Sequence, residues 1–396
     1  MSLNKRIYLK QGKEESLKRF HPWIFSGAIS RAEGNPEEGD LVDVIGSRGE
    51  FLARGHCQIG SIAVRILTFE DEAIDADFWR RRIESAWNLR MRLKLFDTQK
   101  NTAFRLVHGE GDFLPGLIID FYSDTAVVQA HSVGMHLVRR EIAEALQAVV
   151  GGKLKNIFYK SEGTLPYKAA LEPENGYLFG GSEVSGVALE NGLKFKIDWL
   201  KGQKTGFFVD QRDNRSLLEK FSENRHVLNL FCYTGGFSCF ALRGGAALVH
   251  SVDSSAKAID LTRENVGLNF GNDARHTAFT DDAFRFLEQG GGDYDLIVLD
   301  PPAFAKHQSA LKNALVGYRK LNAAAIRKIQ PGGIIFTFSC SQAVSRENFR
   351  LAVFSAAAQT GKRVKILHQL TQAADHPINL YHPESEYLKG LVLEIE

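Results

Sequence analysis

The chain has 396 residues, 44% of them hydrophobic and 24% charged, a composition typical of soluble globular proteins and not of disordered or membrane-spanning ones. A chain of this length is too long to fold around one ordinary hydrophobic core, so two or three domains are expected. The net charge of +2 excludes a uniformly basic protein. Basic residues still gather in segments 5–31 and 80–94, and such patches are typical of an anionic partner such as nucleic acid. Each segment alone also fits a solvated helix face.

The sequence contains no pattern for export, membrane insertion or metal binding. The basic N-terminus is not followed by an apolar stretch, and the longest apolar runs are shorter than a bilayer span. A cytoplasmic protein without a membrane partner is therefore expected. The four cysteines, at irregular spacing, predict neither a disulfide framework nor a zinc site, so no metal is predicted: Cys57, Cys232, Cys239 and Cys340.

The first two domains are predicted from changes in the apolar pattern. Residues 1–74 contain short strand-like runs separated by Gly, Asn and Pro, which favours a small β-rich barrel or sandwich. Residues 75–186 combine helical periods at 75–96 and 138–150 with strand-like runs, which predicts a central α+β domain. This domain is expected to end in the Gly- and Ser-rich linker "ENGYLFGGSEVSG" (174–186).

Residues 187–396 are predicted to form an α/β domain with a doubly wound, Rossmann-like sheet. After a hairpin-like segment at 187–200, near-continuous apolar runs alternate with amphipathic helices. Apolar runs of this kind are typical of central strands in a parallel sheet: "HVLNLF", "AALVHSVD", "DLIVLD" and "GGIIFTFS".

The strand ends of this domain indicate a nucleoside cofactor. Ligands of open parallel sheets bind at the carboxyl ends of the strands, near the point where the strand order reverses. The second strand ends at Asp253, eighteen residues after Gly235, a spacing that suits a carboxylate bound to a ribose diol. The motif G-x-G-x-x-G is missing, so S-adenosylmethionine (SAM) fits better than a dinucleotide. The turn after the first strand carries Tyr233, Thr234, Gly235 and Gly236, and the third strand is followed by Asp281 and Asp282, either of which is a candidate for the adenine amino group.

The fourth and fifth strands indicate the chemistry. Asp300 is followed by Pro301 and Pro302, which fix the backbone at the strand tip, and Phe304 offers a face on which a base could stack. Such Asp-Pro-Pro tips also occur in enzymes that methylate amino groups. Cys340, after the fifth strand, favours methylation of a pyrimidine C5, because a thiolate added at C6 makes C5 nucleophilic. The alternative for Cys340 is a small buried residue.

Several motifs resemble the ribosomal large-subunit methyltransferase I family over nearly the whole chain. The N-terminal segments "HPWIFSGAI" and "RGHCQIGSIAVRIL" are similar to its PUA domain, and "RLVHGEGDFLPGLIIDFY" resembles its central domain. In that stretch Phe113 stands where a glycine is expected. The catalytic domain is matched by "KTGFFVDQRDNR", "LNLFCYTGGFS", "LDPPAFAK", "FSCS" and "QAADHP…EYLKG".

The resemblance implies SAM-dependent methylation of a cytosine C5 in 23S rRNA. It implies that Cys340 is the nucleophile, that Asp300 is the carboxylate of the base pocket, and that Pro301, Pro302 and Phe304 contact the substrate. Asp253 matches the ribose-binding acid and Asp282 the adenine contact. Phe208, Asp210, Gln211 and Arg212 match the segment that closes the cofactor site, with Gln211 and Arg212 expected near the methionine carboxylate. A homodimer is a further expectation that the resemblance raises.

Other functions remain open at this level. An amino-group or uridine-C5 RNA methyltransferase would use the same scaffold. A non-catalytic RNA-binding assembly factor with a vestigial cofactor site is an alternative of another class. A nicotinamide-dependent dehydrogenase is disfavoured by the missing glycine motif.

Overall fold

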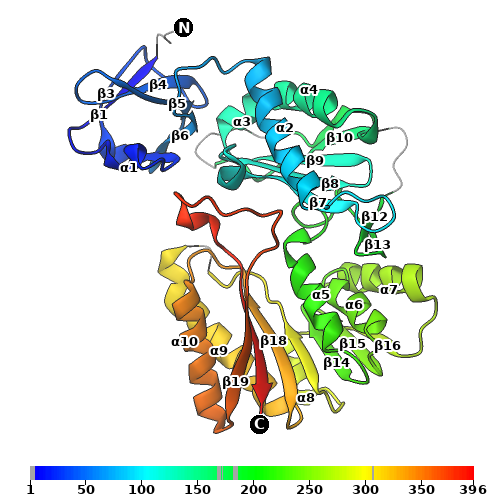
Figure 1. Ribbon diagram of the computed structural model, residues 1–396. Coiled ribbons are helices and arrows are strands. Elements are labelled where there is room, and N and C mark those ends of the chain that lie inside the picture. Colours follow the sequence, from blue (N-terminus) through cyan, green and yellow to red (C-terminus); the bar gives the residue numbers. More distant parts are fainter. Residues whose placement is uncertain (1–4, 167–170, 172, 182–185, 306) are drawn as a thin grey trace. The chain divides into compact units, whose positions relative to one another are not determined.

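The computed structural model describes residues 5–166, 171, 173–181, 186–305 and 307–396 (Figure 1). Residues 182–185 of the predicted linker lie outside this set. The chain forms two compact units: unit 1 comprises Met1–Leu189, Ile197–Phe207 and Ala374–Ser385, and unit 2 comprises Glu190–Lys196, Phe208–Ala373 and Glu386–Glu396. The division into three domains at residues 74 and 186 stays a prediction.

Unit 1 begins with a six-stranded sheet in the order β2-β6-β5-β4-β1-β3. The β-rich character predicted for this region is confirmed, and the apolar residues of its strands form a core of their own around Ile7, Val42 and Val64. The elements are β1 (Arg6–Leu9), α1 (Glu15–Lys18), β2 (Trp23–Phe25), β3 (Ile29–Glu33), β4 (Leu41–Ile45), β5 (Phe51–Cys57) and β6 (Ile62–Thr68).

The rest of unit 1 is built on a five-stranded sheet in the order β11-β10-β9-β8-β7, so the predicted α+β character is confirmed. Helix α2 begins at its capping residue Asp75, whose carboxylate accepts the Phe78 N–H, and buries one apolar face. The elements are α2 (Ala76–Arg92), β7 (Ala103–His108), β8 (Leu117–Tyr122), β9 (Thr125–Ala130), α3 (Val133–Leu137), α4 (Arg139–Val150), β10 (Asn156–Tyr159) and β11 (Gly176–Phe179).

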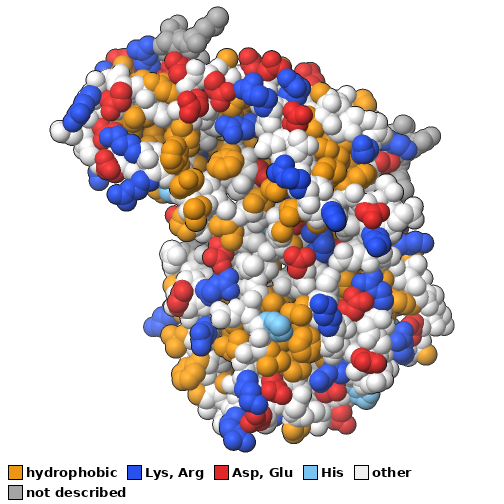
Figure 2. All heavy atoms as spheres, in the orientation of Figure 1, with side chains coloured by type: hydrophobic (Ala, Val, Ile, Leu, Met, Phe, Trp, Pro, Cys, Tyr) orange, Lys and Arg blue, Asp and Glu red, His pale blue; other side chains and the backbone are white. Residues whose placement is uncertain are grey.

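One member of the second basic segment is not available to any partner. Arg90 is fully buried, and its Nη2 donates to Asp112 Oδ2 at 2.7 Å and to the carbonyl oxygen of Asp375 at 2.7 Å. The expectation of a surface patch is therefore wrong for Arg90, because its position on α2 faces the core. Other basic residues are paired at the surface, such as Lys5 with Asp40, and Figure 2 shows cationic and anionic side chains interspersed.

Unit 2 contains a seven-stranded sheet in the order β16-β15-β14-β17-β18-β20-β19. The four apolar runs form the adjacent strands β15, β14, β17 and β18, which pair in parallel as predicted. The antiparallel pair formed by β20 with β18 and β19 was not predicted. The strands are β14 (His226–Leu230), β15 (Leu248–Asp253), β16 (His276–Thr280), β17 (Leu296–Leu299), β18 (Gly333–Ser339), β19 (Val364–Leu370) and β20 (Lys389–Ile395). The hairpin predicted at 187–200 is present as β12 (Val187–Glu190) and β13 (Leu193–Lys196).

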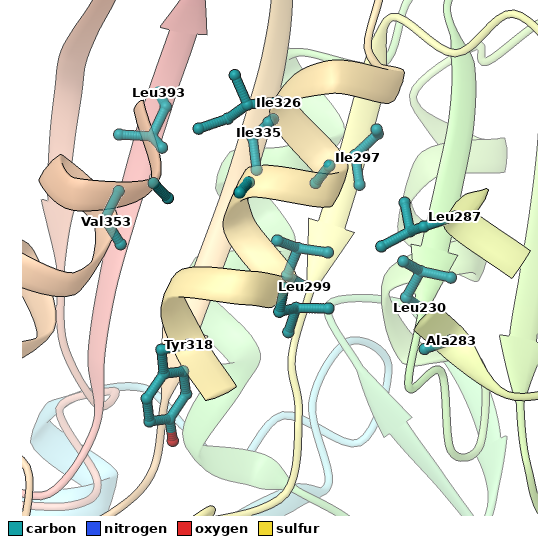
Figure 3. Close-up of a cluster of buried hydrophobic side chains, with 14 of the residues drawn as sticks. Leu230, Ala283, Leu287, Ile297, Leu299, Tyr318, Ile326, Ile335, Val353 and Leu393 are labelled. Carbon is teal, nitrogen blue, oxygen red and sulfur yellow. The ribbon is translucent and has the colours of Figure 1, made fainter. Parts of the chain in front are cut away.

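Helices cover both faces of this sheet, which confirms the doubly wound α/β class. Helices α8, α9 and α10 pack against one another on one face, and α5, α6 and α7 on the other (Figure 1). Figure 3 shows the first of these layers, with Ile326 of α9 beside Ile335 of β18 and Val353 of α10 near Leu393 of β20. The helices are α5 (Arg212–Lys220), α6 (Gly236–Arg243), α7 (Ala256–Phe270), α8 (Ala283–Gln289), α9 (Leu311–Lys328) and α10 (Arg346–Thr360). Among the described residues, no helix is both long and apolar enough to cross a bilayer.

The first prediction concerns the buried Arg90. We expect Arg90→Leu to destabilise unit 1 by about 3–5 kcal/mol, because the Asp112 carboxylate would stay buried without its cation. Arg80→Leu, on the exposed face of the same helix, is the control and should change stability by less than about 0.5 kcal/mol. Thermal and urea unfolding would measure both, and equal effects of the two substitutions would contradict the assignment.

Candidate active site

The carboxyl ends of the parallel strands in unit 2 meet at one edge of the sheet. The chain leaves β14 for β15 on one side and later adds β17 on the other, so the strand order reverses beside β14. Residue register aligns Leu230 with Val252 and with Leu299, which places the loops that follow these strands side by side. The sequence-predicted residues Tyr233, Asp253, Asp282, Asp300 and Cys340 all stand at or just beyond these strand ends.

The turn between β14 and α6 is strained, a feature that the sequence pattern did not reveal. Phe231 and Tyr233 have φ angles of 58° and 47°, which non-glycine residues rarely adopt. Three contacts hold the turn: Asp253 Oδ2 accepts the Tyr233 N–H at 3.0 Å, Thr262 Oγ1 donates to the Tyr233 carbonyl at 2.8 Å, and Asn265 donates to the Thr234 carbonyl at 2.8 Å. The backbone before helix α6 is thereby fixed in advance of any ligand.

Gly235 is required by the turn itself. Its φ is 75°, and a Cβ at this position would lie 2.7 Å from Thr262 Cγ2. A Cβ on Gly236 would lie 3.1 Å from Arg215 Cδ. Close packing against α7 and α5 therefore explains both glycines without a ligand, and their place at the N-terminus of α6 leaves backbone amides directed at the sheet edge.

Asp253 is the carboxylate best placed to bind a diol. It is half-buried at the end of β15, and its Oδ1 also accepts the Ser255 N–H at 2.9 Å. Each carboxylate oxygen can accept a second hydrogen bond, so the side chain is fixed in orientation and keeps acceptor capacity.

The two neighbouring aspartates differ in their surroundings. Asp281 forms an ion pair with Arg285, with Nε at 2.6 Å from Oδ1, and this hydrogen bond lowers the pKa of the carboxyl. Asp282 is exposed and caps helix α8, where its Oδ1 accepts the Phe284 and Arg285 N–H groups at 3.0 Å each. The ion pair occupies Asp281, and Asp282 is the carboxylate that stays exposed at the edge.

The segment before α5 lies across the same edge, where four of its residues are predicted to close the cofactor site. Gln211 is buried, and its Nε2 donates to Asp300 Oδ1 at 3.0 Å; its contact with the methionine carboxylate stays a prediction. Arg212 is buried, Asp210 Oδ2 accepts the Tyr387 hydroxyl at 2.5 Å, and the ring of Phe208 lies 5.1 Å from that of Tyr233.

Arg215 holds this segment in place and was missed by sequence reasoning. Its Nε and Nη2 donate to the carboxylate of Glu190 at 2.6 and 2.7 Å, and Nη2 also donates to the Phe208 carbonyl at 2.9 Å. Both charged side chains are almost fully buried, so this bidentate pair fixes the backbone beside Phe208. The sequence around Arg215 gives no indication that its partner, Glu190, lies 25 residues earlier in the chain.

The tips of β17 and β18 are tied together around Cys340. The Cys340 Sγ lies 3.8 Å from the Pro301 carbonyl oxygen. On either side of the cysteine, Ser339 Oγ and Ser341 Oγ lie 2.9 and 3.1 Å from the Tyr318 hydroxyl, and Ser341 Oγ accepts the Ala305 N–H at 3.2 Å. The two serines of "FSCS" are therefore buried anchors that leave the thiol between them at the edge.

Phe304 is less available than predicted. Its ring packs on Tyr318 with centroids 4.7 Å apart, and a Cβ on Gly317 would lie 3.0 Å from it, so α9 covers one face. The ring is half-buried, and any base that stacks on it must use the remaining face.

Cys340 differs from the other three thiols in its surroundings. Burial raises the pKa of Cys232 to about 12 and of Cys239 to about 12, which keeps both thiols protonated at neutral pH. Cys57 has a pKa raised to about 11, chiefly by burial, and belongs to unit 1. Cys340 is half-buried at the strand edge beside Asp300.

A buried lysine accompanies Cys340 and was not singled out from the sequence. Lys389 opens β20 opposite Ser339, and its Nζ donates to the Ser341 carbonyl at 2.7 Å. Burial lowers the pKa of its ammonium to about 8, and the interaction with Cys340 acts in the opposite direction. The antiparallel pairing of β20 with β18, which the sequence did not predict, is what brings this charge to the thiol.

Comparison with known proteins identifies the family. A family model of S-adenosylmethionine-dependent methyltransferases matches residues 172–377, and a PUA-like domain model matches residues 7–69. The chain is 41% identical over 394 residues to the ribosomal RNA large subunit methyltransferase I of Tolumonas auensis, with 98% of each chain covered. It is 42% identical over 395 residues to the protein of the same name from Aeromonas hydrophila, again with 98% of each covered.

The chain belongs to the ribosomal RNA large subunit methyltransferase I family. The predicted resemblance is thus confirmed, and this family member is a SAM-dependent methyltransferase. Its fold is also that of a SAM-dependent methyltransferase from Streptococcus mutans, with a TM-score of 0.83, 21% identity, and 98% and 99% of the two chains covered. A second solved methyltransferase, complexed with SAH, gives a TM-score of 0.84 at the same identity and coverage.

The described residues fit SAM. A fixed turn with helix N-terminal amides, a half-buried carboxylate with spare acceptor capacity and an exposed second carboxylate lie on consecutive strand ends. These groups match the amino acid, ribose and adenine parts of a nucleoside that carries no phosphates. We expect Asp253 to bind the ribose, Asp282 the adenine and the loop of Tyr233, Thr234, Gly235 and Gly236 the methionine part.

The second prediction tests the ribose contact. Asp253→Asn should weaken SAM binding about tenfold or more, because the ribose hydroxyls would lose a charged acceptor. Asp260→Asn, an exposed carboxylate on α7, is the matched control. Isothermal titration calorimetry with SAM measures both dissociation constants, and an Asp253→Asn value within twofold of the wild type would exclude the assigned contact.

Proposed function

We propose that this enzyme forms 5-methylcytosine in 23S rRNA through a covalent adduct between Cys340 and C6 of the base. One observation carries the proposal: the half-buried thiol of Cys340 lies beside the Asp300 tip at the edge of the SAM-binding sheet. The curated relatives are named as large-subunit rRNA methyltransferases, and the PUA-like domain supports an RNA substrate.

The reaction follows from the two strand tips. The Cys340 thiolate adds to C6, a carbon–sulfur bond forms, and the electron pair moves to C5. SAM, when bound, supplies the methyl group as an electrophile. Methyl transfer to C5 would leave S-adenosylhomocysteine. Loss of the C5 proton to water then re-forms the C5–C6 double bond, the carbon–sulfur bond breaks and the thiolate leaves. The adduct therefore needs a thiolate that both attacks and departs at neutral pH.

Asp300 is expected to orient the base. Its carboxylate is half-buried and already accepts a hydrogen bond from Gln211, which fixes its direction. A carboxylate in this place can accept a hydrogen bond from the exocyclic amino group of cytosine, or from N3–H when N3 is protonated. Because the target base of a structured RNA is stacked, it must leave the stack to reach Cys340.

The third prediction concerns the nucleophile. Cys340→Ala should abolish methyl transfer to deproteinised 23S rRNA from cells that lack this gene, because no C6 adduct can form. Cys57→Ala, which removes the other half-buried thiol, should keep full activity. Nucleoside mass spectrometry of the product identifies 5-methylcytosine, 5-methyluridine or an N-methylated base. Methyl transfer by Cys340→Ala would overturn the covalent route, and either of the latter two products would overturn the target.

The fourth prediction assigns Lys389 a positioning role toward Cys340. If its ammonium stabilises the thiolate, Lys389→Met should shift the pH midpoint of Cys340 alkylation by iodoacetamide upward by about one unit. In the wild type the Lys389 ammonium is charged below its pKa of about 8 and can stabilise the thiolate there. Above that pH the ammonium loses its proton and this stabilisation is lost. Lys365→Met on β19, which is exposed, is the control. An unchanged midpoint in Lys389→Met would restrict this lysine to a structural role.

A further inference from the structure

Unit 1 contains a pocket of about 340 Å³ that none of the preceding functions uses. It lies where the turn after α1, the end of β6, helix α2 and the loops around residues 113 and 380 meet. Its lining contains four aromatic rings, one cation, one carboxylate and a side-chain amide: Phe20, Phe69, Phe113, Tyr381, Arg82, Glu70 and Asn379. Its size falls at the lower end of the roughly 300–1,000 Å³ range of small-ligand pockets.

Three of these four aromatic rings are exposed, whereas Phe69 is half-buried. Phe20, Phe113 and Tyr381 keep 49%, 50% and 45% of their surface accessible, and the Phe20 and Tyr381 rings lie 5.3 Å apart. Figure 2 shows hydrophobic side chains reaching the surface among mixed charges over the N-terminal sheet. Exposed aromatic rings grouped at one pocket are typical of a binding surface.

Two of these phenylalanines stand in an unfavourable backbone conformation. Phe20 has a φ of 62° and Phe113 a φ of 58°, in the left-handed region that favours glycine. Phe113 follows the 3-10 helix η2 (Gly109–Asp112), at the position where a glycine most often ends a helix, and where the family resemblance predicted glycine. Strain kept at residues that line one pocket points to a use for those side chains.

The loop that carries Phe113 is rigid. Asp112, the preceding residue, is held by the buried Arg90, and Glu110 Oε1 accepts the Trp23 Nε1–H at 2.8 Å. A Cβ on Gly111 would lie 1.9 Å from the Pro377 carbonyl oxygen, so the loop also packs closely on the segment 374–385. The ring is thus presented in one place before any ligand arrives, which lowers the entropy lost on binding.

The pocket also carries groups that suit a nucleotide. Arg82 donates from Nη2 to the Leu67 carbonyl at 3.1 Å, and among the described residues no carboxylate lies within 4.0 Å of its guanidinium. Arg19, next to Phe20 in the chain, is exposed. The Asn379 side chain donates to the Glu110 carbonyl at 3.0 Å, and its Oδ1 accepts the Tyr381 N–H at 2.9 Å, which leaves one lone pair of this oxygen for a base edge.

We propose that this pocket binds an unpaired nucleobase of the RNA substrate, stacked on Phe113 and Phe20, with the flanking phosphates near Arg82 and Arg19. Aromatic rings beside cations are the usual platform for single-stranded RNA, whereas a duplex offers no free base face. This inference rests on the proposed RNA substrate and adds a second contact, in unit 1, to the base at Cys340.

The left-handed backbone of Phe113 allows one substitution to separate RNA binding from stability. Phe113→Gly removes the stacking ring and relieves the backbone, so we expect RNA binding to fall while the melting temperature stays equal or rises. A fluorescein-labelled single-stranded RNA of twelve nucleotides of mixed sequence is the probe, with fluorescence anisotropy as the readout. The dissociation constant should increase at least about fivefold, the loss of one stacked base.

Four controls make the result specific. Phe25→Ala removes an equally exposed ring outside the pocket, and Asn35→Gly relieves a positive φ outside it; neither should change the affinity by more than twofold. The slope of affinity against salt should stay the same in Phe113→Gly, because no phosphate contact is removed. A duplex of the same sequence should bind the wild type and Phe113→Gly equally.

The outcomes separate this inference from the proposed function. An unchanged affinity of Phe113→Gly for the single strand, with the melting temperature maintained, would overturn the base pocket even if 5-methylcytosine is formed. A fivefold loss confined to the single strand supports it whichever nucleoside is the product. An equal loss of RNA affinity in Phe25→Ala would indicate general apolar contact with the RNA, and it would also overturn the base pocket.

Discussion

Hydrogen bonds between Tyr318 and the two serines beside Cys340 fix the strand tip on which the proposed chemistry depends. Ser339 Oγ donates to the Tyr318 hydroxyl, and Ser341 Oγ lies within hydrogen-bond distance of it, so the tip of β18 is attached to helix α9 on both sides of Cys340. The Ala305 N–H extends the attachment to the loop after β17. A thiol on a flexible loop would sample many positions, whereas the backbone of Cys340 is fixed beside the Asp300 tip. The side chain of Cys340 is then the only part of the proposed nucleophile that can move.

Buried ion pairs perform a related function around the site and in unit 1. Glu190 and Arg215 fix the segment that carries Phe208, and Arg90 and Asp112 fix the loop that carries Phe113. Such pairs add little net stability, since both charges lose their hydration, but they define one geometry for the loops they join. In unit 2 the ion pair lies next to the candidate active site, and in unit 1 it lies next to the pocket that we propose binds a base. Neither pair is part of these surfaces.

The strands, the sheet class and the strand-end residues could be predicted from the sequence because they depend on local patterns. Apolar runs that end at Asp253 and Asp300 show both the strand and its tip. The position of Lys389 could not be predicted, since it depends on β20 inserting antiparallel between β18 and β19. The hydrogen bond from Gln211 to Asp300 could not be predicted either, since it spans 89 residues and no local pattern indicates it. The burial of Arg90 was hidden by the surrounding exposed arginines of α2.

The contact between Arg90 and the Asp375 carbonyl joins residues 285 positions apart. Unit 1 therefore includes a segment, residues 374–385, that the ribosome makes after nearly all of unit 2. At about 5–20 residues per second, roughly a quarter of a minute to a minute passes between the synthesis of these two partners. During this interval the Arg90 guanidinium and the loop around Gly111 lack the segment that covers them in the folded protein. The nascent N-terminal half is thus expected to remain open at this surface until residues 374–385 have been made, which makes this segment a determinant of how the first hundred residues complete their folding.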